Sequence, residues 1–149
     1  MTQIVVREPE SQEEFQAYFY LRWEVLREPL GQPCGTEKDE KDDGAIHIAA
    51  FLDSDVVGVG RLHLNNSKEA QIRWMAVVPE FQKQGIGSKI LEKLEEAARL
   101  LGASRIVLDA REQVVGFYES KAYEVVFDFR SPRTNLSCKR MQKQSLERQ

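Results

Sequence analysis

The sequence predicts an α/β (α+β) fold built on a mixed, mostly antiparallel sheet. Three short apolar segments, at residues 45–52, 56–64 and 69–78, are separated by turn residues, which is typical of an antiparallel meander. A glycine-containing loop then leads into a helix over residues 86–101, and an apolar strand follows at 104–110. Such a strand is buried on both faces, which favours parallel pairing through a right-handed crossover.

The composition predicts one soluble domain spanning residues 1–149. Apolar residues make up 42% of the chain and charged residues 30%, as in ordinary globular proteins. No apolar run approaches the roughly 20 residues of a membrane span and no secretory signal is present, so we expect a cytoplasmic protein without a membrane partner. A net charge of −3 argues against nucleic-acid binding. Cys34 and Cys138 fit no metal-binding spacing, so we expect reduced thiols and no metal.

The N-terminal segment predicts a strand at residues 3–7 followed by a helix. Ser11 and Glu14 have the spacing of a capping box, and Pro29 ends the helix. The expected apolar stripe consists of Phe15, Tyr18, Phe19, Trp23 and Leu26. Arg22 lies near the end of this helix, where it is a candidate ligand for an anionic group of a substrate.

Residues 29–45 form a long acidic loop in this prediction. The segment contains two prolines and three glycines and has almost no apolar residues to bury. Its acidic residues do not have EF-hand spacing, because Lys41 occupies a ligand position and no Glu closes the loop. We therefore expect a solvated loop that mildly favours cationic ligands.

Arg61 and His63 are the polar residues of interest in the meander. They lie two residues apart on one strand, so their side chains share a face. Arg61 is a candidate for substrate binding. His63 is a candidate for both substrate binding and general-base catalysis.

The loop before the helix at 86–101 has the features of a phosphate site. The first N–H groups of a helix have no partner within the helix, and the macrodipole adds positive charge there. Gly85 and Gly87 remove Cβ atoms that would keep a ligand from the backbone, and both can adopt positive φ. Three lysines against one glutamate between residues 82 and 93 make the region locally basic. A phosphate or pyrophosphate fits this loop.

The C-terminal part of the chain predicts a short helix and a hairpin. The helix covers roughly residues 112–121, and the two strands cover 123–130 and 135–141. The tail at 142–149 lacks apolar periodicity, so we expect it to fray.

Together these elements resemble the GNAT superfamily of N-acetyltransferases over nearly the whole chain. The motif VxPxx(R/Q)xxGxG is matched by Val77, Pro79, Gln82, Gly85 and Gly87, and the later A…FYxxxGF signature by Ala110, Phe117 and Tyr118. The opening LRWEVLRE is similar to the small bacterial ElaA-like branch. The resemblance implies a sheet of six or seven strands with helices on both faces, and acetyl-CoA as co-substrate.

Two positions depart from the family pattern. Ala122-Tyr123 replaces the usual Gly-Phe, which puts a turn geometry in doubt, and Arg111 replaces an Asn or Gln that contacts the cofactor. The alternative of a catalytically silent acyl-CoA-binding module therefore stays open. A dinucleotide-binding loop is a second alternative, since Asp109 follows Gly87 by 22 residues.

The resemblance also implies where acetyl-CoA binds and reacts. The pyrophosphate is expected on the loop, the pantetheine arm beside the strand before it, and the thioester oxygen near an N–H of Met75 or Ala76. The implied cofactor-binding residues are Met75, Ala76, Val77, Gln82, Lys83, Gln84, Gly85, Ile86, Gly87, Ser88 and Tyr118.

The expected reaction is direct attack of a primary amine of a small molecule or peptide, through a tetrahedral intermediate. The family pattern assigns Tyr118 to protonate the leaving thiolate. The amine must lose a proton, and His63, Glu28 or a water chain between them is the candidate acceptor of that proton. The acidic loop favours a cationic amine substrate, whereas Arg22 and Arg61 favour an anionic group on it. The final hairpin offers a surface for a homodimer.

Overall fold

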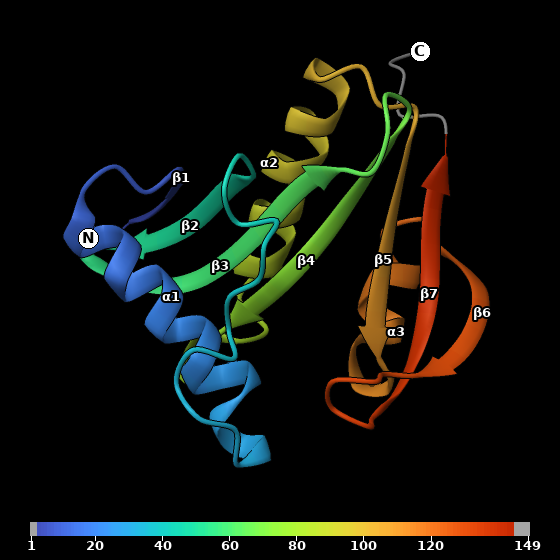
Figure 1. The fold of residues 1–149 in the computed structure, drawn as a ribbon. Helices are drawn as coiled ribbons and strands as arrows, with labels where there is room; N and C mark the ends of the chain where they lie inside the picture. Colours follow the sequence, from blue (N-terminus) through green and yellow to red (C-terminus); the bar gives the residue numbers. More distant parts are fainter. Residues whose placement is uncertain (1–2, 145–149) are drawn as a thin grey trace.

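The computed structural model describes residues 3–144, which form one seven-stranded sheet with helices on both faces (Figure 1). The strands are β1 (Ile4–Arg7), β2 (Ile46–Leu52), β3 (Asp55–Leu64), β4 (Glu69–Val77), β5 (Arg105–Arg111), β6 (Glu124–Arg130) and β7 (Ser137–Gln144). The helices are α1 (Gln12–Leu26), α2 (Ile86–Leu100) and α3 (Val115–Glu119), with short 3₁₀ turns at Glu28–Leu30, Pro79–Phe81 and Glu112–Val114. The predicted fold class is confirmed.

The strand order is β1-β2-β3-β4-β5-β7-β6, and only β4 and β5 pair in parallel. This confirms the predicted meander and crossover. The parallel pairing is short, because it joins only Glu69–Ile72 of β4 to Arg105–Leu108 of β5. Beyond it the two strands diverge toward their C-terminal ends, as Figure 1 shows. Within the described residues, β4 therefore has no strand partner on this side after Ile72.

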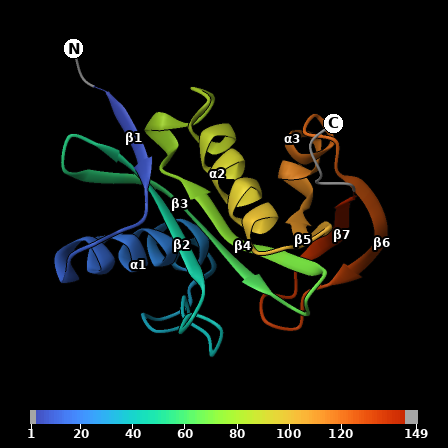
Figure 2. The ribbon, with the colours of Figure 1, turned by 90° about the horizontal axis from the view of Figure 1, so that it is seen from above.

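Helix α1 covers one face of the sheet, and α2 and α3 cover the other (Figure 2). Helix α2 buries a continuous apolar stripe made of Ile86, Ile90, Leu91, Leu94 and Ala98, as its periodicity predicts. It packs very closely on β3, because Gly58 and Gly60 face it. A Cβ on either glycine would lie 2.8 Å from an atom of Ile90, so β3 needs glycine at both positions.

Strand β4 carries a β-bulge where it diverges from β5. Opposite Gly60, Trp74 and Met75 occupy the space of one residue, and Trp74 has a φ of 63°. The bulge breaks the usual alternation, so Arg73 and Trp74 both lie on the α1 face while Met75 packs against α2. A non-glycine residue in this conformation is strained, and such strain is typical of functional sites.

Helix α1 differs from its prediction in two details. Ser11 caps the helix as expected and accepts the Glu14 N–H at 3.0 Å, but the Glu14 carboxylate bonds Arg7 and the N–H of Glu10. The buried side of the helix is also less apolar than its predicted stripe, because Arg22 lies on it with no exposed surface.

The turn after α3 keeps the geometry that the departure from the family pattern had put in doubt. Ala122 adopts a φ of 73°, and the N–H of Tyr123 bonds the carbonyl of Tyr118 at 3.1 Å, as in a glycine-capped helix end. Alanine therefore occupies a left-handed position that glycine adopts at lower cost.

The final strand is longer than predicted. Residues 142–144 belong to β7 instead of a frayed tail, because their backbone pairs with β5. The remainder of the predicted tail lies outside the described residues. Within residues 3–144, no helix has both the length and the hydropathy for a membrane span, and no three acidic, His or Cys side chains group as metal ligands would.

Candidate functional site

The loop between β4 and α2 presents backbone to solvent. Gly85 is the N-cap of α2 with a φ of 83°, and Lys83 also has a positive φ of 65°. Gln82, Lys83, Gln84 and Gly85 are all exposed, Ile86 is buried in the core, and Ser88 is half-buried. This part of the anion-site prediction therefore agrees with the geometry.

The prediction of a positive φ at Gly87 is wrong. Gly87 lies in the first turn of α2 with an ordinary helical backbone. A Cβ added there would meet Phe117 at 3.6 Å, which is a normal van der Waals distance. Neither the backbone conformation nor the packing within the chain requires glycine at this position.

The side chain of Gln82 fixes the loop to the end of β4. Its Nε2 donates to the carbonyl of Val77 at 2.8 Å, and the Nε2 of Gln84 donates to the carbonyl of Glu80 at 3.3 Å. Because Gln82 already has this partner, the loop contributes backbone N–H groups more readily than side-chain amides to a ligand.

The free side of β4 carries unpaired backbone groups beside this loop. The N–H of Val78 points toward β3, where it bonds the carbonyl of Val57 at 3.0 Å. Successive N–H groups of a strand alternate in direction, so those of Val77 and Met75 point to the other side, toward the divergence from β5. The N–H of Ala76 points back to β3. Of the two predicted oxyanion donors, Met75 therefore has the suitable direction.

Tyr118 of α3 lies in the core on the α2 face. Its ring packs edge-on against Phe117 and Tyr123, with centroids 5.0 and 5.7 Å away. Burial raises the pKa of Tyr118 well above its ordinary value, so the phenol is protonated at neutral pH. No hydrogen bond of its hydroxyl forms within residues 3–144, which leaves that group available to a ligand.

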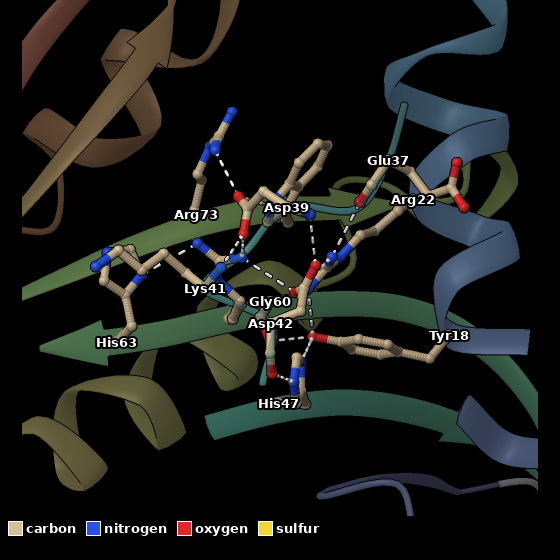
Figure 3. A network of polar contacts seen from close by, with 12 residues as sticks. Tyr18, Arg22, Glu37, Asp39, Lys41, Asp42, His47, Gly60, His63 and Arg73 are labelled. Carbon is tan, nitrogen blue, oxygen red and sulfur yellow. Dashed lines mark hydrogen bonds and ion pairs between the residues drawn. The ribbon is translucent and has the colours of Figure 1, made fainter. Parts of the chain in front are cut away.

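A buried ionic network joins the 31–45 loop to the α1 face of the sheet (Figure 3). Arg61 donates to Asp39 at 2.6 Å and to Asp42 at 3.0 Å, and Arg22 pairs with Asp42 at 2.9 Å. Arg73 pairs with the second oxygen of Asp39 at 2.7 Å. The side chains of Arg22 and Arg61 are at most 1% exposed and that of Asp39 is 2% exposed. These pairs hold the loop over the sheet.

Tyr18 and His47 complete the network. The Nε2 of His47 lies 2.9 Å from the carbonyl of Asp42, which can only accept, so this nitrogen carries the proton. Burial lowers the pKa of His47, so its Nδ1 is unprotonated and lies 2.8 Å from the Tyr18 hydroxyl, which also has the Gly60 carbonyl as an acceptor at 3.1 Å. Arg22 in turn donates to the Tyr18 oxygen at 3.2 Å. Figure 3 shows these groups converging below the loop.

The network corrects the expectation for the loop and for two candidate site residues. The loop is not simply solvated, because Asp39 and Asp42 are the counterions of Arg22 and Arg61. Both arginines are neutralised by these ion pairs, and their side chains are too deeply buried to contact a substrate. The acidic loop had suggested a cationic substrate and the two arginines an anionic one. These two expectations therefore came from residues that neutralise each other.

The two predicted general bases lie in different surroundings. His63 is half-buried, its Nδ1 is 3.1 Å from Arg61, and burial and the Arg61 charge lower its pKa. It pairs across the sheet with Gln71, roughly 13 Å along β4 from Met75. Glu28 is exposed and directly follows Arg27, whose guanidinium stacks 4.5 Å from the Trp74 ring. Glu28 is thus adjacent in sequence to a residue that contacts the bulge, whereas His63 pairs with a residue four positions before Met75.

Four arginines that the sequence did not single out for a ligand surround the bulge on the α1 face. Arg27 and Arg73 stack on the Trp74 ring, and Arg111 donates to the Leu26 carbonyl at 3.0 Å. Burial and then the charges of Arg111, Arg73 and Arg133 lower the pKa of Arg27 to about 10, so all three of these arginines act electrostatically on Arg27.

Comparisons with known proteins place this geometry among acetyltransferases. The profile of the Acetyltransferase (GNAT) family matches residues 9–123. The uncharacterized N-acetyltransferase YjcF of Bacillus subtilis (strain 168) is 30% identical over 116 residues, which cover 78% of this chain and 82% of YjcF. An aminoglycoside 6'-N-acetyltransferase complexed with coenzyme A has a TM-score of 0.80 at 16% identity, covering 97% of this chain and 98% of that chain. Escherichia coli ElaA has a TM-score of 0.79 at 17% identity, covering 97% of this chain and 100% of that chain.

Proposed function

The chain belongs to the acetyltransferase (GNAT) family and is an acetyl-CoA-dependent acyltransferase, and from this we propose that it acetylates a primary amine by direct attack on the thioester. The resemblance inferred from the motifs is thereby confirmed. The family match favours an enzyme over a silent acyl-CoA binder and over a dinucleotide-binding fold. At 17% identity the likeness to ElaA concerns the fold, so membership of that branch remains a prediction.

The observation that carries the proposal is the glycine at position 87. The chain itself has room for a Cβ there and needs no unusual φ, so a ligand gives the best reason for glycine. We propose that the CoA pyrophosphate lies against the backbone of residues 82–88, where helix N–H groups, the α2 macrodipole and three basic side chains meet it. These side chains are Lys83, Lys89 and Lys93, all exposed.

The free edge of β4 supports a route for the rest of acetyl-CoA. The pantetheine arm would pair beside Met75–Val77, where β5 has already diverged. The N–H of Met75 would then meet the thioester oxygen. A donor fixed before the reaction is typically worth about 3 kcal/mol of transition-state stabilisation.

The proposed chemistry moves one acetyl group and two protons. The amine nitrogen attacks the carbonyl carbon, a C–N bond forms and the C–S bond breaks. The nitrogen loses a proton and the thiolate gains one. We propose Tyr118 as the donor to the thiolate, since its hydroxyl keeps its proton and has no partner within residues 3–144. The burial that raises the phenol pKa would also raise that of a thiol beside it, which moderates the unfavourable transfer.

For the proton lost by the amine we propose Glu28, through water, in preference to His63. The position of Glu28 next to Arg27 supports this choice, and the distance of His63 along β4 argues against a direct role for it. The two can be compared with Glu28→Gln and His63→Gln. We expect only Glu28→Gln to shift the part of the pH profile in which kcat/KM rises with pH.

The phosphate site is tested by replacing Gly87 with Ala, using Gly116→Ala as the matched control. Gly116 also lies in the first turn of a helix, and a Cβ there meets nothing within 4 Å. We expect Gly87→Ala to weaken CoA binding roughly tenfold or more in calorimetry, which corresponds to one hydrogen bond to a charged group, without lowering the unfolding midpoint. Equal CoA affinities for the two variants, or no thiol release from acetyl-CoA with any amine, would contradict the proposal.

Three coarser expectations also remain proposals. We propose that the whole chain is one acetyltransferase domain and that it works in the cytoplasm, where its free Cys34 and Cys138 would stay reduced. We propose a homodimer through β6, which is an edge strand with Val125, Val126 and Phe127 each more than 40% exposed. Light scattering of the parent and of Phe127→Lys tests this: a parent that is monomeric at all concentrations excludes the dimer.

A further inference from the structure

Four arginines come from the elements that border the place where an acceptor amine would meet the thioester, and two of them, Arg27 and Arg73, stack on Trp74. Arg27 comes from the end of α1, Arg73 from the bulge of β4, Arg111 from the end of β5, and Arg133 from the β6–β7 turn. Helix α2 and the phosphate loop lie on the opposite face of the sheet (Figure 2). An acyl group reaching through the divergence of β4 and β5 would therefore be approached by its acceptor from the arginine side.

The walls of this region are tied together by the arginines and by one loop contact. The carbonyl of Leu26 accepts from Arg27 at 3.2 Å and from Arg111 at 3.0 Å, which joins α1 to β5. The Nε2 of Gln32 donates to the carbonyl of Arg133 at 3.1 Å, which joins the long loop to the β6–β7 turn. The cluster is thus part of a surface assembled from four elements.

The charges of the cluster are not balanced within the described residues. Arg27, Arg111 and Arg133 have no carboxylate within ion-pair distance there, and Arg73 shares its partner Asp39 with Arg61. The contacts that Arg27 and Arg111 do make are to neutral carbonyl groups, including Thr36 at 3.3 Å. Arg27 is also only 5% exposed, so water screens it poorly.

Nearby acidic groups supply only part of the missing charge. Asp109 on the adjacent strand is paired with Arg140. The Glu37 carboxylate, which accepts the N–H of Gly35 at 2.7 Å, acts on Arg27 without forming an ion pair with it, so one carboxylate stands against several arginines. Grouping like charges is unfavourable, and burial followed by the charges of Arg111, Arg73 and Arg133 lowers the pKa of Arg27 to about 10, although the charge of Glu37 opposes this shift. All four side chains remain protonated at neutral pH, so the cluster is a ready site for an anion.

We infer that the acceptor amine carries an oxyanion, either a carboxylate or a phosphate, that Arg73, Arg111 and Arg133 hold it on the α1 face, and that the buried Arg27 adds its charge. The inference rests on the proposed function, whose substrate class it names. Guanidinium groups bind both oxyanions through paired hydrogen bonds, and the planar fork orients the ligand as well as attracting it. This anchor would direct the amine at the other end of the molecule toward the β4 bulge.

The inference is tested with matched amines in which only the anion differs. Glycine is compared with glycinamide, and phosphoethanolamine with ethanolamine, so that the two pairs separate carboxylate from phosphate. The variants are Arg133→Gln and Arg111→Gln. Arg111→Lys is added because it keeps the positive charge but removes the planar guanidinium group that can donate two parallel hydrogen bonds. Arg99→Gln, near the end of α2 on the other face, removes the same charge elsewhere. Arg133 is the cleanest site, because its side chain is exposed and makes no hydrogen bond within residues 3–144.

Two readouts are needed, namely acetyl transfer and calorimetric binding of each amine to protein saturated with CoA. We expect the parent to prefer the anionic member of at least one pair. Arg133→Gln should raise the KM of that member on the order of tenfold, the usual effect of losing one charged hydrogen bond. It should leave the KM values of the neutral member and of acetyl-CoA unchanged, and added salt should diminish the preference.

Other outcomes overturn the inference in distinguishable ways. If the anionic and neutral members bind equally, the cluster does not select an anion, whether or not acetyl transfer occurs. If Arg133→Gln raises the KM of acetyl-CoA instead, the arginines serve the phosphates of CoA. Failure of the proposed function shows itself separately, as absence of thiol release with every amine, and calorimetry still decides the preference in that case.

Discussion

Replacing Asp39 with Asn tests whether the buried ionic network holds the 31–45 loop on the sheet. The carboxylate bonds Arg61 through one oxygen at 2.6 Å and Arg73 through the other at 2.7 Å. Asparagine keeps the size but removes the charge, and its NH₂ group would face a guanidinium that can only donate. Arg61, with its side chain 1% exposed, would then depend on Asp42 alone.

The expected loss of stability follows from two independent estimates. Although burial alone would raise it, the hydrogen bond and charge of Arg61 lower the pKa of Asp39 from 3.8 to about 2. By linkage this difference amounts to about 2 kcal/mol of folding free energy at neutral pH. Breaking a buried ion pair costs about 3–5 kcal/mol, and the remaining Asp42 partner brings the value to the lower part of that range. We expect Asp39→Asn to lose about 2–4 kcal/mol.

The assay is denaturant unfolding at neutral and acid pH, with Asp43→Asn as control. Asp43 lies in the same loop, is exposed, and makes no ion pair within residues 3–144, so its replacement should stay within about 0.5 kcal/mol of the parent. Since the folded pKa of Asp39 is depressed, its contribution is full above about pH 4 and is lost as the pH falls through about 2. The difference between parent and Asp39→Asn should shrink over that interval. An Asp39→Asn midpoint equal to that of Asp43→Asn would refute the reasoning.

Three further predictions concern single positions. Tyr118→Phe should lower kcat by on the order of 10²-fold with CoA affinity retained, because only the proton donor is lost; an unchanged kcat in steady-state assays would exclude the role. Ala122→Gly should raise the free energy of unfolding by about 0.5–1 kcal/mol, because glycine adopts the φ of 73° without strain; a lowered midpoint in denaturant would contradict this. Gly60→Ala should cost about 1–3 kcal/mol, because its Cβ would lie within 3 Å of Ile90, Met75 and Leu94; retention of the parent's melting temperature would show that α2 can move away.

The sequence predicted the order of the elements because each depends on local patterns. The apolar period of α2, the turns of the meander and the Ser11 cap all lie within a few residues, and they are confirmed. The close approach of α2 to β3 could not be predicted in this way. It depends on Gly58 and Gly60 meeting Ile90 from a distant segment, and a glycine within a strand pattern signals only that something approaches.

The backbone of the loop before α2 was easier to predict than the ion pairs on the α1 face. This loop is one continuous segment, so its exposed backbone and the positive φ at Gly85 could be predicted from the motif, whereas its role as a phosphate site stays a proposal. Arg22 and Arg61 were interpreted as substrate ligands because their counterions, Asp39 and Asp42, lie in a loop that appeared solvated. A signal was present nonetheless: two arginines placed among apolar strand and helix positions require buried carboxylates, and only the acidic loop could supply them.

Asp39 pairs with Arg61 of the buried network and with Arg73 of the arginine cluster at the bulge. It therefore connects the structure of the loop to the proposed choice of substrate. Arg22, Arg61 and Arg73 face two carboxylates, so the network carries one positive charge in excess, and Arg73 is its most exposed member. Arg73 also stacks on Trp74 beside Arg27, where the unbalanced cluster begins. The buried network therefore neutralises two carboxylates of the loop, Asp39 and Asp42, and leaves a positive surplus at the bulge. Two acidic residues that suggested a preference for a cationic ligand thus serve as counterions inside the fold, and the arginines beside them face the bulge.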